Sequence, residues 1–263
     1  MSKAAFVKTI GRVDSLWRYP IKSMGGERVP DTYAGPFGLH GDRLLAFESA
    51  GAALGKPMVT GAERTAMLRC QARFLPSAQS RTDADDDEAI AAFDSGADSH
   101  SDVEVETWSG ARYVAGDPAL IAALQAGLPN SQAMRLKRSE RPMMDCRPIA
   151  LISLQTLRRL SEEMGFPVDA RRFRANILLD LDSGDGFGED AFVGRTLRVG
   201  DQTEITIKER DPRCRIITID PATGKRTPTL MTHLARQHDG KAGVYGVATT
   251  PGPIAAGDLI TLT

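Results

Sequence analysis

Cysteine and histidine are scarce in this chain. Only three of its 263 residues are cysteine and four are histidine, and no Cys-x-x-Cys pair occurs. Structural zinc sites and iron–sulfur clusters usually take several cysteine ligands, and a disulfide framework needs several paired cysteines. None of these is therefore expected, and any redox chemistry would need a group that the chain does not build itself. His233 and His238 fall in one expected helix but, five residues apart, do not share a face, so surface or packing roles are expected.

Long apolar runs and an excess of one charge are also absent. No stretch reaches the roughly 20 apolar residues that a membrane helix needs, and residues 1–17 lack the pattern of a secretory signal. Lys plus Arg (33) nearly balances Asp plus Glu (34), so no overall field attracts nucleic acid or an anionic membrane. We therefore expect a cytoplasmic location, and any anion site must be local.

Short strand-like runs dominate the chain. Alternating apolar and polar residues bounded by Gly, Pro and Asp predict strands at 13–20, 43–48, 66–74, 103–108, 111–114, 176–180, 196–200, 204–210, 215–220, 243–249 and 258–263. Three helices are expected, at 117–128, 154–165 and 228–238. Many short strands and few helices favour a closed or partly closed barrel over a doubly wound sheet.

Two stretches set the expected domain organisation. Residues 76–102 are acidic with few large apolar side chains, which predicts a mobile surface loop within the first domain, with docking of a partner as the alternative role. A basic, Pro-containing stretch at 136–145 precedes a new apolar run and predicts domains 1–140 and 141–263. Whether the first strand, near Val13 to Tyr19, closes the barrel of the second domain is left open.

One cysteine lies in an unusual setting. Cys214 stands between Arg213 and Arg215, with Lys208 and Arg210 upstream, at the mouth of an apolar run. Cationic neighbours favour the thiolate, which attacks electrophiles and binds soft metals. A half-buried structural cysteine explains the pattern about equally well, and no nearby histidine offers itself as a base for nucleophilic catalysis.

Several other stretches favour an anionic ligand. Lys22 and Ser23 precede a double glycine, a turn in which backbone N–H groups, an ammonium and a hydroxyl can converge on a phosphate. Arg43 leaves another glycine turn, and Arg174 within RRFRAN is able to clamp a phosphate bidentately. Ser153 at a helix start supplies a further anion-friendly position. Each feature also has a simpler explanation as a turn, a solvated rim or a helix cap.

Seven motifs in order along the chain resemble those of one family. They are YPIKS (19–23), GLHGDR (38–43), DCRP (145–148), FRANILLD (173–180), RCRIITIDPATG (213–224), VYG (244–246) and GPIAAGD (252–258). The chain resembles the MOSC-domain proteins, relatives of the C-terminal domain of molybdenum cofactor sulfurase, in the group with an extra N-terminal MOSC domain. Its best-known members are the mitochondrial amidoxime reducing component and its bacterial relatives. The resemblance implies a mixed α+β, mostly β fold: a MOSC β-barrel packed against a smaller α/β N-terminal domain, with a cofactor site between them.

The resemblance also implies roles for particular residues. Cys214 corresponds to the protein ligand of molybdenum, where a thiolate would complete a sulfur-rich set around a metal already bound by two dithiolene sulfurs. The residues implied as contacts of the pterin cofactor are Lys22, Ser23, Arg43, Ser153, Arg174, Asn176 and Arg213, with Tyr245 on the substrate-side wall. Asp211 stands where some relatives have a second cysteine, so disulfide switching is not expected.

The implied activity is a two-electron reduction that removes oxygen from an N-hydroxylated compound and leaves the amine and water. Because the chain has no cluster-binding cysteines, the electrons are expected from a separate protein. One alternative is a non-catalytic carrier of molybdenum cofactor, or of persulfide sulfur on Cys214. Another is a barrel-shaped binding module with a degenerate site. Nucleic-acid binding is not supported, because the net charge is near zero and no aromatic and basic platform appears.

Overall fold

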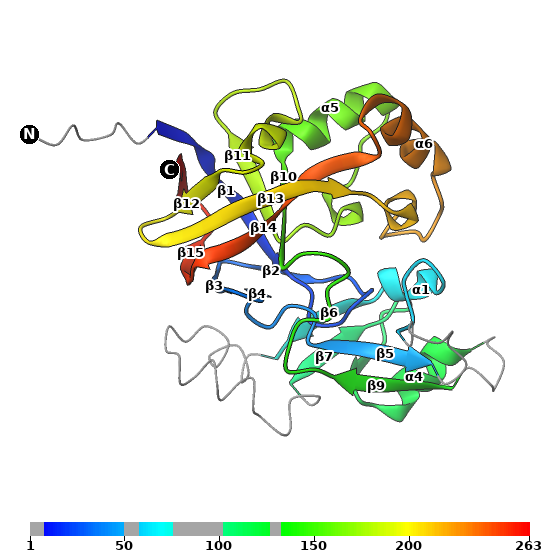
Figure 1. Ribbon diagram of the computed structural model, residues 1–263. Helices are drawn as coiled ribbons and strands as arrows, with labels where there is room; N and C mark the ends of the chain where they lie inside the picture. Colours follow the sequence, from blue (N-terminus) through cyan, green and yellow to red (C-terminus); the bar gives the residue numbers. More distant parts are fainter. Residues whose placement is uncertain (1–7, 50–57, 76–101, 127–132) are drawn as a thin grey trace, which may run out of the picture.

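The computed structural model describes residues 8–49, 58–75, 102–126 and 133–263, and the expected acidic loop therefore lies almost wholly outside the described residues. Figure 1 shows a β-barrel above a smaller lobe of short sheets. Seven strands form the barrel: β1 (Lys8–Arg18), β10 (Ile149–Ser153), β11 (Ile177–Leu181), β12 (Thr196–Val199), β13 (Thr203–Pro212), β14 (Lys241–Thr250) and β16 (Leu259–Leu262). The predicted mostly β, barrel-containing fold is confirmed.

The first strand closes the barrel. The strands follow the order β11-β10-β14-β13-β12-β16-β1, and β1 pairs with β11 as well as with β16. This answers the question that the sequence left open about Val13 to Tyr19. A short strand, β2 (Glu27–Val29), pairs with the last residues of β1 and leads the chain toward the smaller lobe.

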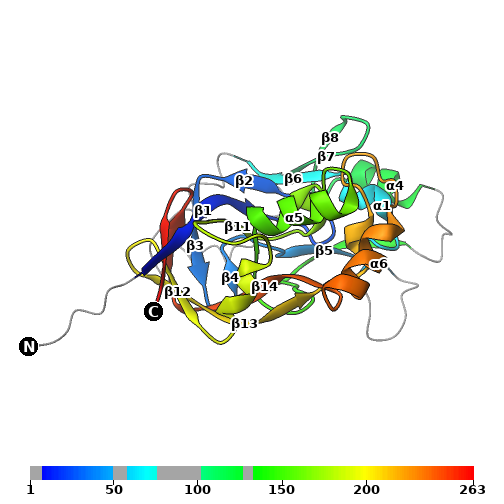
Figure 2. The same ribbon diagram turned by 90° about the horizontal axis from the view of Figure 1, so that it is seen from above.

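Alternation along the strands fills the barrel and covers one of its outer faces. On β10, Ile149 and Leu151 lie in the interior cluster, while Ala150 and Ile152 lie in an outer cluster. Side chains of a strand point to opposite faces in turn, so a strand that is apolar at every position is buried on both sides. The helices α5 (Leu154–Met164) and α6 (Pro228–Gln237) cover this face, with α5 on β10 and β11 and α6 on β14 (Figure 2).

A three-stranded sheet of β3 (Asp31–Gly35), β4 (Gly38–Leu39) and β15 (Gly252–Ala255) adds Ala34, Leu39 and Ile254 to the interior cluster of the barrel. The smaller lobe holds two further short sheets, one of β5 (Leu45–Ser49) and β9 (Met134–Arg138) and one of β6 (Gln71–Phe74), β7 (Val103–Glu106) and β8 (Arg112–Val114). With α1 (Thr65–Leu68) and α4 (Pro118–Gln125) they enclose a second apolar cluster that includes Phe47, Met67 and Leu120. The division into domains 1–140 and 141–263 stays a prediction.

The three expected helices are confirmed, one expected strand is wrong, and another is only partly correct. Residues 215–220 form a 3-10 turn, η4 (Arg215–Thr218), because Pro212 ends β13 and the Thr218 hydroxyl donates to the Arg215 carbonyl. The stretch 66–74 begins as helix α1 and becomes strand only from Gln71. Two further 3-10 helices are η2 (Ala170–Arg172) and η3 (Gly188–Phe192). Among the described residues, no helix is both long and apolar enough to cross a membrane.

Candidate functional site

Three of the predicted cofactor contacts share a rare backbone conformation. Five described non-glycine residues have positive φ, and three of them are Ser23 (68°), Arg43 (53°) and Arg174 (53°). The left-handed region is costly for residues with a side chain, and such strain concentrates at functional sites. The three lie on separate turns, after β1, before β5 and before β11, which the fold brings together between the barrel and the smaller lobe.

Arg43 is the centre of this junction. Its Nη2 donates to the Arg174 carbonyl (3.0 Å), its Nη1 donates to Asn176 Oδ1 (3.4 Å), and its guanidinium lies 4.8 Å from the centre of the Tyr19 ring. It also forms an ion pair with the fully buried Asp42. Burial opposes the charge, but Asp42 keeps the pKa of Arg43 above its ordinary value.

Arg174 carries an unsatisfied buried nitrogen. Its Nη1 donates to the Met24 carbonyl and its guanidinium lies 4.4 Å from the centre of the Tyr19 ring, but Nη2 has no hydrogen-bond partner among the described residues. Burial, followed by repulsion from Arg43, lowers the pKa of Arg174 to about 10. A desolvated cation beside a second cation is stabilised by an anion, so the site is chemically suited to a phosphate.

A small pocket opens beside Arg174. It holds about 20 Å³ and is lined by Tyr19, Gly25, Arg171 and Arg174, among others. This is room for about one water-sized group. The double glycine serves close packing rather than a wide anion turn, because a Cβ at Gly26 would lie 2.2 Å from the Arg18 carbonyl oxygen and one at Gly25 2.7 Å from that of Cys70.

Lys22 reaches the same junction from the turn after β1. Its Nζ donates to the Met143 carbonyl (2.8 Å) and to Asp145 Oδ1 (2.5 Å). The Asp145 side chain is 78% exposed, whereas that of Lys22 is 12% exposed. An ion pair with a solvated partner contributes little to stability. A ligand anion could therefore replace Asp145 as the partner of Lys22 at low cost. Ser23, the next residue, is buried.

Asn176 holds the frame of the site rather than facing a ligand. It is fully buried; its Nδ2 donates to the Trp17 carbonyl (3.2 Å), and its Oδ1 accepts from the backbone N–H of Ala150 (3.2 Å) and from Arg43. These bonds tie β1, β10 and β11 together behind Arg43. Substitution of Asn176 would therefore act on the site through Arg43.

Cys214 lies in the turn that follows β13, linked to the same junction. Its side chain is exposed. The preceding residue, Arg213, pairs with Asp211, donates from Nη2 to the Phe173 carbonyl (2.6 Å), and has an Nε without a partner among the described residues. Phe173 directly precedes Arg174, whose carbonyl accepts from Arg43. Two consecutive carbonyls therefore accept hydrogen bonds from Arg213 and from Arg43.

The field around Cys214 is less positive than its sequence neighbours suggest. Arg210 is paired with Asp190 (2.8 Å) and Asp239 (3.1 Å), and Arg213 with Asp211. Local carboxylates thus neutralise two of the expected cations.

Ser153 is not brought to this junction. It is fully buried at the far end of β10, where its hydroxyl caps α5 and donates to Glu189 Oε2 (2.6 Å). The expected helix cap is confirmed. A buried carboxylate occupies the position where an anion would bind, so the structure gives no support to Ser153 as a cofactor contact.

The buried Asp211 interacts with the half-buried Tyr245, which the sequence did not predict. Burial raises the pKa of Asp211 to about 6, and burial together with the nearby Asp211 raises the pKa of Tyr245. Tyr245 is half-buried on β14 and pairs in register with Glu209 and Ala150. In the sequence, Asp211 lies three residues before Cys214, but only the fold shows that Asp211 is buried.

The buried Asp211 predicts a pH dependence of stability. Its pKa is higher in the folded protein than the ordinary value of 3.8, so the folded state holds the proton more tightly and stability falls as pH rises from about 4 to 6. A shift of this size corresponds to about 3 kcal/mol at most. Urea unfolding of wild type and Asp211→Asn between pH 4 and 7.5 tests this: the difference in free energy of unfolding between them should change by that order.

The exposed Asp201 supplies a control, since Asp201→Asn should leave the pH slope of wild type unchanged. Parallel curves for wild type and Asp211→Asn would contradict the assignment. The absolute stability of Asp211→Asn is not the readout, because above about pH 6 the substitution also removes the charged partner of Arg213.

Two family models together cover most of the chain. The MOSC N-terminal beta barrel domain matches residues 10–125, and the MOSC domain matches residues 138–261. Molybdenum cofactor sulfurase of Drosophila mojavensis is 31% identical over 147 residues, which are 54% of this chain and 17% of that protein. That of Drosophila pseudoobscura pseudoobscura is 32% identical over 97 residues, 36% of this chain and 12% of that protein. The chain thus spans less than a fifth of either relative's length.

Solved structures show weaker similarity. The YUAD protein from Bacillus subtilis aligns over 98% of both chains with a TM-score of 0.45 and 11% identity. YiiM from Geobacillus stearothermophilus aligns over 44% of this chain and 54% of its own, with a TM-score of 0.36 and 21% identity. The assignment therefore rests on the two domain models: the chain belongs to the MOSC-domain proteins that carry an N-terminal MOSC domain, a family related to the molybdenum cofactor.

Proposed function

We propose that the protein binds molybdenum cofactor and reduces N-hydroxylated compounds. The observation that carries the proposal is Arg174, a buried cation with an unsatisfied nitrogen, held with Arg43 in left-handed backbone near the segment that presents an exposed Cys214. A phosphate-bearing pterin would supply an anion for Arg174, since Arg43 is already paired with Asp42. A thiolate supplies a soft ligand for its metal.

The cofactor contacts fall into two groups. Arg174, Arg43 and Lys22 would bind the phosphate and offset its charge, with Ser23 beside them. Cys214 would bind the molybdenum at the exposed end, next to Tyr245 and Arg213 on the barrel side. When bound, the cofactor supplies two-electron oxygen-transfer chemistry that protein side chains cannot perform.

The proposed reaction consumes two electrons and two protons. The N–O bond of the substrate breaks, the nitrogen gains one proton and becomes the amine or amidine, and the hydroxyl oxygen gains the other and leaves as water. The chain's own residues position the substrate and hold protons. Asp211, with its pKa raised to about 6 and three residues from Cys214, is the described carboxyl best suited to hold one near neutral pH.

The electrons come from a separate donor protein in this proposal. None of the three cysteines has the spacing of a cluster site, and two of the three, Cys146 and Cys214, are exposed while Cys70 is buried.

A substrate panel tests the activity. Cofactor-loaded protein with a chemical reductant should convert at least one hydroxylamine, amidoxime or N-hydroxylated base to its amine or amidine, with one product per two electrons consumed. Heat-denatured protein with the same cofactor content is the control for free molybdenum chemistry. Failure on every member of the panel by fully loaded protein would contradict the proposal.

The exposed thiol and the names of the curated relatives favour one second candidate. A carrier would hold molybdenum cofactor, or persulfide sulfur on Cys214, for delivery to other proteins. Gel filtration in the presence of a cofactor-free acceptor protein separates the two: an enzyme keeps its cofactor, whereas a carrier exchanges it rapidly. Mass spectrometry of intact protein would show the persulfide as an added sulfur that Cys214→Ala lacks.

A further inference from the structure

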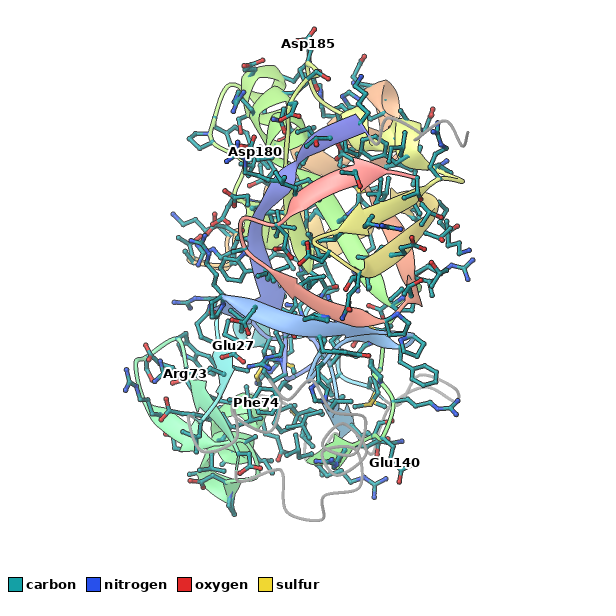
Figure 3. All side chains as sticks on the ribbon, turned by 90° about the vertical axis from the view of Figure 1, so that its left-hand side faces the viewer. Glu27, Arg73, Phe74, Glu140, Asp180 and Asp185 are labelled. Atoms are coloured by element: carbon teal, nitrogen blue, oxygen red, sulfur yellow. The ribbon has the colours of Figure 1, made fainter. Side chains whose placement is uncertain are left out.

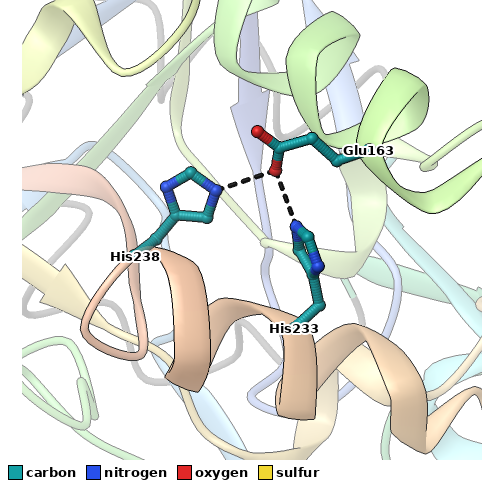
Figure 4. Close-up of side chains that lie close together, drawn as sticks. All are labelled: Glu163, His233 and His238. Carbon is teal, nitrogen blue, oxygen red and sulfur yellow. Dashed lines mark hydrogen bonds and ion pairs between the residues drawn. The ribbon is translucent and has the colours of Figure 1, made fainter.

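Two histidines and a glutamate converge outside the proposed cofactor site. Nε2 of His233 and Nε2 of His238 lie 2.7 and 2.8 Å from the same oxygen, Oε2 of Glu163 (Figure 4). Five residues apart on one helix they would not share a face. However, α6 ends at Gln237, and the non-helical backbone of His238 (φ −135°, ψ 26°) turns its ring back toward α5. The expectation that the two rings do not share a face is therefore wrong for this pair.

We propose that Glu163, His233 and His238 bind one zinc ion. Two imidazole nitrogens and one carboxylate oxygen are a ligand set that zinc takes in three-ligand sites, with water in the fourth position. The three ligand atoms all lie within 4.8 Å of one another. Ligands of a tetrahedral zinc at 2.0–2.1 Å lie about 3.3 Å apart. Binding the ion would therefore lengthen the two distances from Glu163 Oε2, now 2.7 and 2.8 Å, by roughly half an ångström, and would bring the two histidine nitrogens, which lie within 4.8 Å of each other, to the same spacing.

The surroundings of the cluster hold the ligands in place. The other oxygen of Glu163 accepts from Arg159 Nε (2.6 Å), and the His238 ring stacks on Phe187 with centroids 3.9 Å apart. Partners of this kind orient ligands and fix their rings. The side chains of Glu163, His233 and His238 are 16%, 23% and 16% exposed, so an ion and its water can enter from solvent.

The ligand chemistry distinguishes zinc from the common hard cations. Magnesium and calcium prefer sets made of oxygen, whereas two imidazoles suit zinc and its first-row neighbours. A zinc ion here would link α5 to α6. The helix α6 packs on η4, the turn that directly follows Cys214. By fixing α6, the ion would stabilise the position of this turn.

Histidine nitrogen signals give a direct test. The chain has only four histidines, so long-range ¹H–¹⁵N spectra of the full-length protein resolve each ring, with assignment by His233→Gln and His238→Gln. One equivalent of zinc should shift the Nε2 signals of His233 and His238 and leave those of His40 in place. Magnesium at the same concentration should shift none of them. Zinc bound by the exposed thiols of Cys146 and Cys214 would not shift these histidine nitrogen signals, so it does not interfere with the test.

A matched pair of variants separates the site from the helix. Glu163→Gln should weaken zinc binding at least about 100-fold, the upper end of the effect of losing an outer-sphere partner, because it removes a ligand itself. Glu162→Gln, the exposed neighbour on α5, should bind as wild type does. Absence of histidine shifts in wild type at millimolar zinc, or equal binding by Glu163→Gln, would overturn the proposal and leave a hydrogen-bonded triad that joins two helices.

Discussion

The Arg174→Met variant is expected to lose bound pterin cofactor and to remain folded. The substitution removes two potential charge-assisted hydrogen bonds to a phosphate, each contributing about 1.5–3 kcal/mol, so cofactor affinity should fall about 100-fold or more. Stability of the cofactor-free protein should change by no more than about 1 kcal/mol, because relief of a buried cation next to Arg43 offsets the lost bond to Met24. Pterin fluorescence after oxidation and urea unfolding measure the two effects.

The same substitution at Arg198 is the control. Arg198 is an exposed residue of β12 that pairs with Glu204, so Arg198→Met should retain pterin at the wild-type level. Equal pterin content in Arg174→Met and wild type would contradict the assignment of Arg174. Loss of pterin together with loss of several kcal/mol of stability would instead indicate a structural role.

Glu27→Gln is expected to cost about 3–5 kcal/mol of unfolding free energy, since it removes the carboxylate that pairs with the buried Arg18 guanidinium. Glu27 Oε1 accepts from Arg18 Nε (3.0 Å) and from the backbone N–H of Phe74 (3.2 Å), and Arg18 is fully buried with its guanidinium 4.6 Å from the centre of the Phe74 ring. Figure 3 labels Glu27 and Phe74 where the barrel meets the smaller lobe. The pair thus links β1 and β2 to β6.

Urea unfolding of three variants tests this link. Glu106→Gln, in the exposed pair with Arg112 on β7 and β8, should cost less than about 1 kcal/mol. The double substitution Arg18→Met and Glu27→Leu should recover much of the loss, because it removes the buried guanidinium as well. A Glu27→Gln effect no larger than that of Glu106→Gln would show that the pair does not hold the lobes together.

The fold class could be predicted from local sequence patterns. The structure of residues 215–220 and the closure of the barrel by β1 could not. Alternation and turn residues predicted most strands of the barrel, and capping residues predicted the helices. The run RIITID failed because adjacent apolar residues suit a strand buried on both faces and a 3-10 turn equally well. Whether β1 closes the barrel depended on pairing with β11 and β16, contacts that no local pattern specifies.

The motifs predicted which residues the candidate site would contain, and the structure shows which of them lie together. Lys22, Ser23, Arg43 and Arg174 meet at the junction of barrel and lobe. Ser153 lies apart from them, which the sequence could not show, because a serine before a helix has the same local signature whether a ligand or a buried glutamate meets it.

The sequence also could not show which charged groups have unusual properties, because these properties depend on burial. The raised pKa of Asp211 and the unsatisfied nitrogen of Arg174 depend on burial by segments distant in sequence. The cluster of His233, His238 and Glu163 was missed because helical spacing applies only as far as the helix runs.

The central claim is that Cys214 binds the molybdenum of a pterin cofactor. Mass spectrometry of metal, with pterin assayed alongside, on protein from cells that make the cofactor tests it in wild type, Cys214→Ala and Cys146→Ala. Near-stoichiometric molybdenum and pterin in wild type and Cys146→Ala are expected, with molybdenum lost from Cys214→Ala. Cys146 is a matched control because its thiol is also exposed. Wild type without metal or pterin, or Cys214→Ala with undiminished molybdenum, would contradict the account.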